Sequence, residues 1–235
     1  MSQLIGSSIL AIVLCQAPAA EVEGFAPAVQ QDALQATVRV VNQKKNAIGT
    51  GVILNRSGAI TFVLTAAHVI DGADRVDVQV FSSQSYPKPA LIHESAAVIV
   101  RAKDKQPDLA VLRVIGYDGA SQSLKLCPIP ELPGKSKFSA LSVGCDDRHL
   151  PTLRSEQVID TVQAKKRNDS QASSYFRTHQ KPSSGRSGGP LVDSRGRLLG
   201  ICSGGDHGQA FYCHLEDIHQ FLRAHGLHAI LNDHP

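Results

Sequence analysis

Short runs of β-branched and other apolar residues, separated by turn-like segments, fill the chain from Ala36 onward. Several runs alternate apolar with polar positions, which is the period of a half-buried strand. Polar, glycine-containing segments such as 55–58 and 193–196 suggest hairpin loops between them. Short strands at such spacing predict an all-β fold, either a barrel or a sandwich. The runs are residues 37–41, 51–54, 60–65, 76–80, 97–100, 109–114, 139–143 and 198–202.

Helical patterns are confined to two segments. Residues 66–70 could form a short turn directly after a strand. From Ile218, apolar or ring-bearing positions recur at i, i+3, i+4 and i+7, which is the stripe of a helix that packs on a core. Asp217 is the expected N-cap of this helix, and Gly226 is the residue expected to end it.

Residues 127–137 contain three prolines and one glycine, a composition that interrupts regular structure. This segment is the predicted linker between two halves of the protein. The expected N-terminal half spans residues 30–126, and the expected C-terminal half, with its helix, spans residues 138–228. A chain of 235 residues is long enough for one large domain or two small ones.

The first 20 residues have the pattern of a secretory signal peptide. A short apolar run at 9–14 is followed by small residues at 17–20, although Met1 to Gly6 contains no Lys or Arg. The run is too short to span a bilayer. We therefore expect a secreted or periplasmic protein with no stable membrane insertion after leader removal. The alternative is an N-terminus that is disordered or packed on the core.

Composition limits the classes of function. The chain is 42% apolar and 19% charged, as in an ordinary globular protein, so disordered and collagen-like classes are excluded. The 24 basic and 21 acidic residues leave a net charge of only +3, which argues against a nucleic-acid partner. Tryptophan is absent and aromatic residues make up 5%, so a platform for stacking bases is not expected.

Four cysteines remain after the predicted leader: Cys127, Cys145, Cys202 and Cys213. Three pairings are possible. Cys202–Cys213 is the easiest to defend, because both lie in apolar stretches that flank the turn-like segment 203–208. Cys127–Cys145 would then be the other disulfide. Four buried free thiols are an equally good interpretation. No C-x-x-C or H-x-x-x-H spacing occurs, so no metal site is expected.

The strongest local signal is residues 185–190, Gly-Arg-Ser-Gly-Gly-Pro. Acyl transfer requires a hydroxyl on a tight turn whose backbone N–H groups converge on the developing oxyanion. The glycines allow a sharp turn and close approach of a substrate. Ser187 is therefore the candidate nucleophile, and the N–H groups of Gly185 and Ser187 are the candidate oxyanion donors. A glycine-rich surface turn without catalysis is the alternative.

A nucleophilic serine needs a neutral imidazole that a third group holds in place. His68 comes directly after an apolar strand-like run, and Asp108 begins another. Alone, the histidine would be structural and the aspartate a turn or cap residue. With Ser187 they stand in the order His, Asp, Ser, which is that of the chymotrypsin-like arrangement. We assign His68 as the base and Asp108 as the residue that orients it.

On these motifs the chain resembles the trypsin/chymotrypsin-like serine peptidases, and within them the protease domain of the bacterial HtrA (Deg) branch most closely. The resemblance covers about residues 35–225. It implies two packed six-stranded antiparallel β-barrels of the chymotrypsin-like type, with the active site in the cleft between them and a short C-terminal helix. Too few residues follow His225 for a PDZ domain, so none is expected. The matching pieces are residues 49–54, 65–70, 108–112, 185–192 and 197–201.

The resemblance also implies where a substrate would bind. Ser203, Gly204 and Gly205 would form one wall of the primary pocket and pair with the substrate backbone, and the two glycines would leave that pocket open. The opposite wall would come from residues 179–184. Basic residues outnumber acidic ones over 165–186, where we favour a solvated basic loop over a site for acidic side chains.

Arg186 departs from the family pattern. Trypsins carry Asp directly before the nucleophile, where it pairs with a new N-terminus on activation, and the HtrA branch usually carries Asn there. A zymogen switch of the trypsin kind is therefore not expected. Arg186 could hold the loop or bind a substrate carboxylate.

The function expected from these residues is a serine endopeptidase that acts on protein or peptide substrates through an acyl-enzyme, without a cofactor. Two alternatives stay open: a catalytically silent binding protein that keeps the barrel fold, and an esterase that uses the same three residues. The sequence does not determine the oligomeric state.

Overall fold

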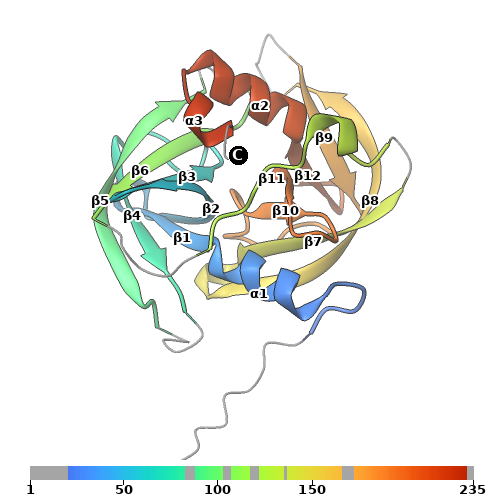
Figure 1. Cartoon of the computed structure of the whole chain (residues 1–235), viewed down its shortest axis with the longest axis horizontal. Helices are drawn as coiled ribbons and strands as arrows, with labels where there is room; N and C mark the ends of the chain where they lie inside the picture. Colours follow the sequence, from blue (N-terminus) through green and yellow to red (C-terminus); the bar gives the residue numbers. More distant parts are fainter. Residues whose placement is uncertain are drawn as a thin grey trace, which may run out of the picture.

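The computed structural model describes residues 21–82, 88–102, 107–116, 122–134, 137–165 and 172–231. Two closed six-stranded antiparallel barrels lie side by side, with α2 above them and α1 below them in Figure 1. The predicted all-β fold of two chymotrypsin-like barrels with a C-terminal helix is confirmed. The predicted signal peptide, 1–20, lies outside the described residues.

The first barrel runs in the order β1-β2-β3-β6-β5-β4. Its hairpin loop after β2 contains Gly58 at φ +58°, a left-handed conformation that glycine adopts without strain. The six strands are β1 (Thr37–Asn42), β2 (Ala47–Ser57), β3 (Ile60–Thr65), β4 (Arg75–Val80), β5 (Leu91–Arg101) and β6 (Ala110–Ile115).

The second barrel runs in the order β10-β11-β12-β9-β8-β7. Its predicted turn at 193–196 is present, because the Gly196 N–H donates to the Asp193 carbonyl at 3.0 Å. The six strands are β7 (Phe138–Cys145), β8 (Pro151–Ala164), β9 (Ser173–Thr178), β10 (Pro190–Val192), β11 (Leu198–Asp206) and β12 (Gln209–His214).

The predicted linker, 127–137, lies between the last strand of the first barrel and β7. It begins with the Cys127 N–H donating to the Leu198 carbonyl at 3.0 Å, and it contains a 3₁₀ turn at Ile129–Glu131. The exact domain boundaries stay a prediction.

Three α-helices are present in the described part of the chain, and their details differ from the prediction. α2 (Leu215–Ala224) begins at His214, whose ring accepts a hydrogen bond from the Glu216 N–H, so Asp217 is not the N-cap. The Asp217 carboxylate instead accepts from the Ser174 N–H at 2.7 Å. Gly226, at φ +71°, follows the helix as expected. The helices α1 (Pro27–Gln35) and α3 (His228–Leu231) were not predicted.

Residues 66–70 form turns rather than a helix, with the Val69 N–H donating to the Ala66 carbonyl at 3.1 Å. This agrees with the short turn expected there. The turn directly follows β3 and carries His68, the predicted base.

The larger of two apolar clusters crosses from the second barrel into the first. Val52, Leu64 and Leu109 of the first barrel belong to the same buried cluster as Leu141, Leu191 and Ile201 of the second. Because the barrels share this core, the ends of β2, β3 and β7 are held against one another. The predicted site residues lie at this junction.

All four cysteines of the described chain are buried and free. Cys202 lies opposite Tyr212 in the ladder between β11 and β12, and Cys213 lies opposite Ile201. The two cysteines are one register position apart, so their side chains point to opposite faces of the sheet. The Cys202–Cys213 disulfide is therefore wrong, and so is its companion Cys127–Cys145, whereas the interpretation as four buried thiols is confirmed.

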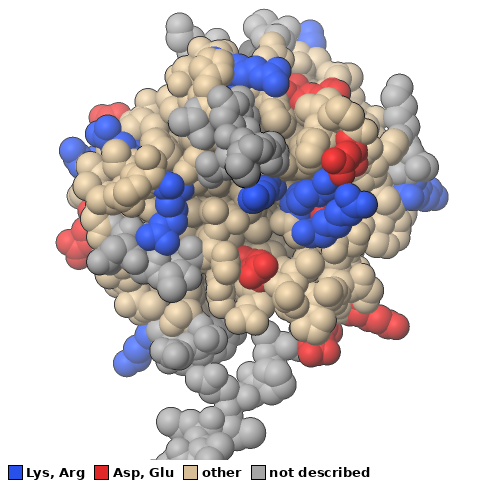
Figure 2. All heavy atoms as spheres, in the orientation of Figure 1, with Lys and Arg blue, Asp and Glu red and all other residues tan. Residues whose placement is uncertain are grey.

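The surface carries both signs of charge. On the face shown in Figure 2, basic and acidic residues are interspersed, and the basic ones form no continuous field there. The absence of a nucleic-acid partner stays a prediction. Within the described residues, no helix has the length and apolar character needed to cross a membrane.

Candidate active site

His68 and Asp108 form a tightly bonded pair at the end of the first barrel. The Asp108 carboxylate contacts the His68 ring at Nδ1 over 2.7 Å, and it also accepts from the His68 backbone N–H at 3.0 Å. The Asp108 side chain is fully buried, whereas 35% of the His68 side chain is exposed. This geometry places the proton on Nδ1 and leaves Nε2 as a proton acceptor that faces outward.

Ser203, predicted from the sequence as a wall of the primary pocket, is a third member of this cluster, and its contact with Asp108 was not predicted. Its hydroxyl donates to the Asp108 Oδ2 at 2.6 Å. The ladder between β11 and β12 shifts register between Cys202 and Gly204, so Ser203 is an extra, unpaired residue whose side chain is turned out of the strand alternation. The sequence Ser-Gly-Gly did not predict this contact, because the contact depends on a β-bulge that the sequence pattern does not reveal.

The loop before β10 turns sharply at two glycines and carries the predicted oxyanion donors. Gly185 has φ +91° and Gly188 has φ +87°. A side chain at Gly188 would also overlap the Thr50 carbonyl, so only glycine fits there. Among the described residues, the N–H groups of Gly185 and Ser187 donate to no acceptor, while those of Arg186, Gly188 and Gly189 are all bonded. Both predicted oxyanion donors are thus unbonded in the described part of the chain.

Thr50 in β2 holds this loop from the first barrel. Its hydroxyl donates to the Gly185 carbonyl at 2.7 Å and accepts from the Cys145 N–H at 2.9 Å. Its backbone N–H donates to the Ser187 carbonyl at 2.7 Å. One buried threonine therefore bonds to both ends of the nucleophile turn. The residues joined in this way are up to 135 positions apart in the sequence.

Ser187 lies against the turn that carries His68. A Cβ at Gly49 would come within 3.0 Å of the Ser187 carbonyl and would overlap the side chain of Val69, the neighbour of His68. A Cβ at Gly188 would come within 3.0 Å of the Ala66 backbone nitrogen. The structure thus brings the predicted nucleophile and the predicted base to one junction. Within the described chain no hydrogen bond joins the Ser187 hydroxyl to the His68 ring, a contact that often tightens only when substrate binds.

Arg186 does not face a substrate. Its side chain is buried, and its guanidinium forms two parallel hydrogen bonds with the Asp146 carboxylate, at 2.8 and 2.7 Å. The Ser142 hydroxyl accepts a third hydrogen bond at 2.9 Å. Of the two roles considered for Arg186, binding a substrate carboxylate is wrong, and holding the loop agrees with these contacts.

The two predicted walls of the primary pocket approach each other at Gly205. The backbone of Gly205 packs against Lys181 and Pro182, so that a side chain at this position would overlap the proline ring. The open primary pocket stays a prediction. Around Gly204, at φ +128°, no atom lies within 4 Å of the Cβ position. The two predicted walls thus touch at Gly205 and separate at Gly204.

The predicted basic loop is only partly solvated. Lys181 is exposed, as expected. Arg177, however, pairs with Asp160 across β8 and β9, with its two closest contacts at 3.0 and 2.5 Å. Lys166 and Arg167 lie outside the described residues.

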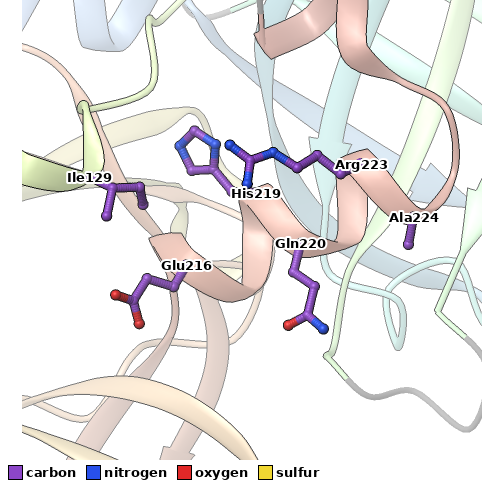
Figure 3. Close-up of a pocket in the computed structure, with 6 residues that line it drawn as sticks. All are labelled: Ile129, Glu216, His219, Gln220, Arg223 and Ala224. Atoms are coloured by element: carbon purple, nitrogen blue, oxygen red, sulfur yellow. The ribbon is translucent and has the colours of Figure 1, made fainter.

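A hollow of about 630 Å³ lies along the outer face of α2, away from the predicted catalytic residues. Figure 3 shows the Arg223 side chain running along the helix toward His219, which lies across from Ile129 of the linker. Burial and the nearby Arg223 lower the pKa of His219, which favours its neutral form. In the part of the chain that the structure describes, no three His, Cys, Asp or Glu side chains gather into a metal-binding group.

Comparison with known proteins agrees with this geometry. Residues 49–201 match the family described as the trypsin-like peptidase domain. The chain belongs to this family. The matched segment contains all three residues predicted as catalytic and both predicted oxyanion donors.

Relatives of this trypsin-like domain include proteins of the HtrA type. The chain is 29% identical over 170 residues to a probable periplasmic serine protease do/HhoA-like of Haemophilus influenzae, covering 70% of this chain and 33% of that protein. It is 25% identical over 185 residues to the serine endoprotease DegS of Salmonella typhimurium, covering 72% and 46%. The chain therefore spans between about a third and a half of the length of these two relatives.

Solved structures show the same fold. The Rv3671c protease of M. tuberculosis in its inactive form superposes with a TM-score of 0.66 at 20% identity, covering 88% of this chain and 99% of that chain. Its active form superposes with a TM-score of 0.65 at 18% identity, covering 96% and 95%.

Proposed function

We propose that this trypsin-like domain is a serine endopeptidase. The observation that carries the proposal is the pair of free N–H groups at Gly185 and Ser187, next to the turn of the bonded His68–Asp108 pair. Acyl transfer needs a nucleophile, a base and donors for an oxyanion in one place. Here these groups come from two barrels that share one core.

The reaction would begin when the Ser187 hydroxyl attacks the carbonyl carbon of a peptide bond. His68 takes the hydroxyl proton at Nε2, and the Asp108 carboxylate stabilises the imidazolium through Nδ1. The carbonyl oxygen becomes an oxyanion that accepts hydrogen bonds from the Gly185 and Ser187 N–H groups. His68 then gives its proton to the leaving amine. Water hydrolyses the acyl-enzyme by the same steps.

The substrate would be an extended segment of a protein or peptide. Ser203, Gly204 and Gly205 would pair with its backbone beside the primary pocket, in line with the open position at Gly204. No cofactor is needed for this chemistry. A secreted or periplasmic location follows from the predicted leader and is in keeping with the relative named as periplasmic.

A serine-reactive fluorophosphonate probe tests the nucleophile. The wild-type protein should be labelled, and Ser187→Ala should lose labelling by at least about 10³-fold. Ser194→Ala, at an exposed serine of the turn 193–196, is the matched control and should label like the wild type. Equal labelling of the wild type and Ser187→Ala would exclude Ser187 as the nucleophile.

Digestion of casein and of a peptide library, read by mass spectrometry, tests the substrate class. Cleavage that disappears in Ser187→Ala supports an endopeptidase. Hydrolysis of nitrophenyl esters without cleavage of any peptide would overturn the proposal in favour of an esterase. A folded protein with neither activity would make the chain a binding protein that keeps the barrels.

A further inference from the structure

Arg186, directly before the proposed nucleophile, is buried among polar groups of the second barrel. Besides the two bonds to Asp146, its guanidinium donates to the Thr152 hydroxyl at 2.9 Å and to the Ser142 hydroxyl at 2.9 Å. The Ser142 hydroxyl in turn accepts from the Tyr212 hydroxyl at 2.9 Å. The planar fork of an arginine is thus matched by acceptors from β7, from β8 and from the turn between them.

The path of the Arg186 side chain is built into β7. A Cβ at Gly144 would lie 2.5 Å from Cγ and 3.0 Å from Cα of Arg186. Because only a glycine leaves this space, the arginine stem passes across the strand at this position. β7 therefore leaves room for the Arg186 side chain at Gly144, and Asp146 pairs with its charge.

The turn that carries Asp146 also touches the oxyanion loop through its backbone. The N–H of Asp147 donates to the Ser184 carbonyl at 2.6 Å. In a trans peptide the carbonyl and the N–H point in opposite directions. A Ser184 carbonyl directed toward Asp147 therefore turns the Gly185 N–H of the same peptide away from Asp147, where it is left without an acceptor.

The turn is bonded to Arg186 at its first residue. Asp147 has φ +46° and lies in the left-handed region, which aspartate adopts more readily than most residues other than glycine. The carboxylate of Asp146 ties the turn to Arg186 and also accepts from the Thr152 hydroxyl at 2.8 Å. The left-handed turn is thus anchored at its first residue.

We propose that the Asp146–Arg186 ion pair is a positioning pair for the oxyanion hole, which fixes the Ser184–Gly185 peptide through the turn Asp146–Arg148. The inference rests on the proposed function, because it names what holds one of its donors. The pair touches neither the substrate nor the reacting atoms. It acts through the Asp147 N–H and through the chain between Arg186 and Gly185.

The charge state of the pair suits this role. Burial raises the pKa of Asp146, but the hydrogen bonds from Arg186 and Thr152 lower it by more, so that the net shift is downward. Asp146 is therefore ionised at neutral pH. Burial lowers the pKa of Arg186, and the bonds to Asp146 more than restore it.

Asp146→Asn tests the proposal, because it keeps the size of the side chain and removes its charge. We expect kcat to fall about 10- to 100-fold with KM changed less than threefold, since loss of one oxyanion donor costs about 10²–10³ in kcat. The affinity for a peptide boronic acid, whose tetrahedral adduct occupies the oxyanion hole, should fall by the same factor. The affinity for the product peptide should stay within twofold.

Asp160→Asn is the matched control. Asp160 also forms a two-bonded pair with an arginine of the second barrel, Arg177, but this pair is partly exposed and has no contact with the oxyanion loop. Its kcat and its boronic acid affinity should equal those of the wild type. The proposal would be overturned if Asp146→Asn has the same kcat as this control. It would also be overturned if the substitution raises KM and leaves kcat unchanged.

A double variant separates positioning from simple loss of stability. Asp146→Asn alone leaves the Arg186 charge buried without its partner, which destabilises the fold. Asp146→Asn combined with Arg186→Gln removes both charges. The melting temperature of this double variant should return most of the way to the wild-type value, while its kcat stays at least tenfold below that of the wild type. Recovery of kcat together with the melting temperature would show that only the buried charge mattered, against the proposal.

A crystal structure of Asp146→Asn provides a readout that does not depend on activity. We expect the Ser184–Gly185 peptide to rotate or to adopt more than one orientation. An unchanged peptide would contradict the inference even if the wild type proved inactive. If the wild type is inactive but Asp146→Asn still frees the Ser184–Gly185 backbone peptide to rotate, the proposed function is refuted. The role of the pair in positioning this peptide would nevertheless be supported.

Discussion

His68 and Asp108 of the first barrel are fixed through bonds between these two residues, whereas the Ser187 turn of the second barrel is fixed by groups from both barrels that never touch its hydroxyl. Asp108 uses both carboxylate oxygens on His68 and adds Ser203. The Ser187 turn is held by its carbonyls, through Thr50 and through Asp147. One half of the site is therefore a compact pair of side chains, and the other half is a backbone shape supported from several strands.

This difference predicts how the halves respond to substitution. In the first barrel a single side chain should control activity without much effect on folding. In the second barrel the same loss of activity should come with a loss of stability, because the supporting groups are buried and bonded to each other.

Asp108→Asn should have the largest effect in the first barrel. The amide cannot accept from both the His68 backbone and Nδ1 as the carboxylate does, so the ring loses the orientation that its reaction needs. We expect kcat to fall about 10⁴-fold, which is typical when the carboxylate that orients a catalytic histidine becomes an amide. Asp74→Asn, at a fully exposed side chain of the same barrel, is the control for kcat with a peptide substrate. A loss below tenfold would remove Asp108 from the proposed mechanism.

Thr50→Val should have the next largest effect, and it tests the link between the barrels. The variant keeps the shape of Thr50 but deprives the buried Gly185 carbonyl and Cys145 N–H of their partner. Two such losses should lower the free energy of unfolding by about 2–5 kcal/mol, measured by urea denaturation. Thr50→Ser keeps the hydroxyl and should lose less than half of that. Equal stability of the two variants would show that the hydroxyl does not support the loop.

His214→Ala should have the smallest effect on kcat, because it lies in the second barrel but outside the site. It removes the acceptor for the Glu216 N–H at the start of α2 and a buried ring that contacts Phe176, which together should cost about 2–3 kcal/mol of stability. The kcat should stay at the wild-type value. A tenfold fall in kcat would mean that support of the Ser187 loop extends further through the second barrel than its contacts indicate.

The same residue should add acid sensitivity. Burial lowers the pKa of His214, because the charged ring loses its contact with water in the folded protein. The neutral ring is also the form that accepts from the Glu216 N–H. The stability that His214 contributes is therefore complete above its ordinary value near pH 6.5 and is lost as the pH falls from there to the lowered folded value. His214→Asn keeps a cap and should flatten the stability curve below about pH 6.5.

The sequence was informative wherever function follows from local pattern. Alternating runs and turn residues predicted an all-β barrel or sandwich, and the resemblance to trypsin-like peptidases implied the two barrels. The order His68, Asp108, Ser187 predicted which residues would meet. Residues 151–164 were missed because β8 is half exposed and rich in polar residues, so its apolar period is weak. Helix α1 was missed because it has little amphipathic character and no side-chain cap.

Other features could not be predicted because they depend on contacts between distant segments. Ser203 reaches Asp108 across 95 positions and through a bulge. Arg186 and Asp146 are 40 positions apart in the sequence. The Arg186 side chain can pass across β7 only because residue 144 is a glycine. The predicted Cys202–Cys213 disulfide was wrong because the strand register turns the two side chains to opposite faces. The spacing of the cysteines in the sequence does not determine this register.

The buried thiols have a consequence for redox chemistry. Burial raises the pKa of Cys145 and of Cys202 to about 12, so that almost none of either residue is thiolate at neutral pH. Since the thiolate is the form that exchanges with disulfides and reacts with oxidants, both positions should be inert to glutathione and to peroxide. The folded barrels should therefore keep these two thiols unmodified under both reducing and oxidising conditions.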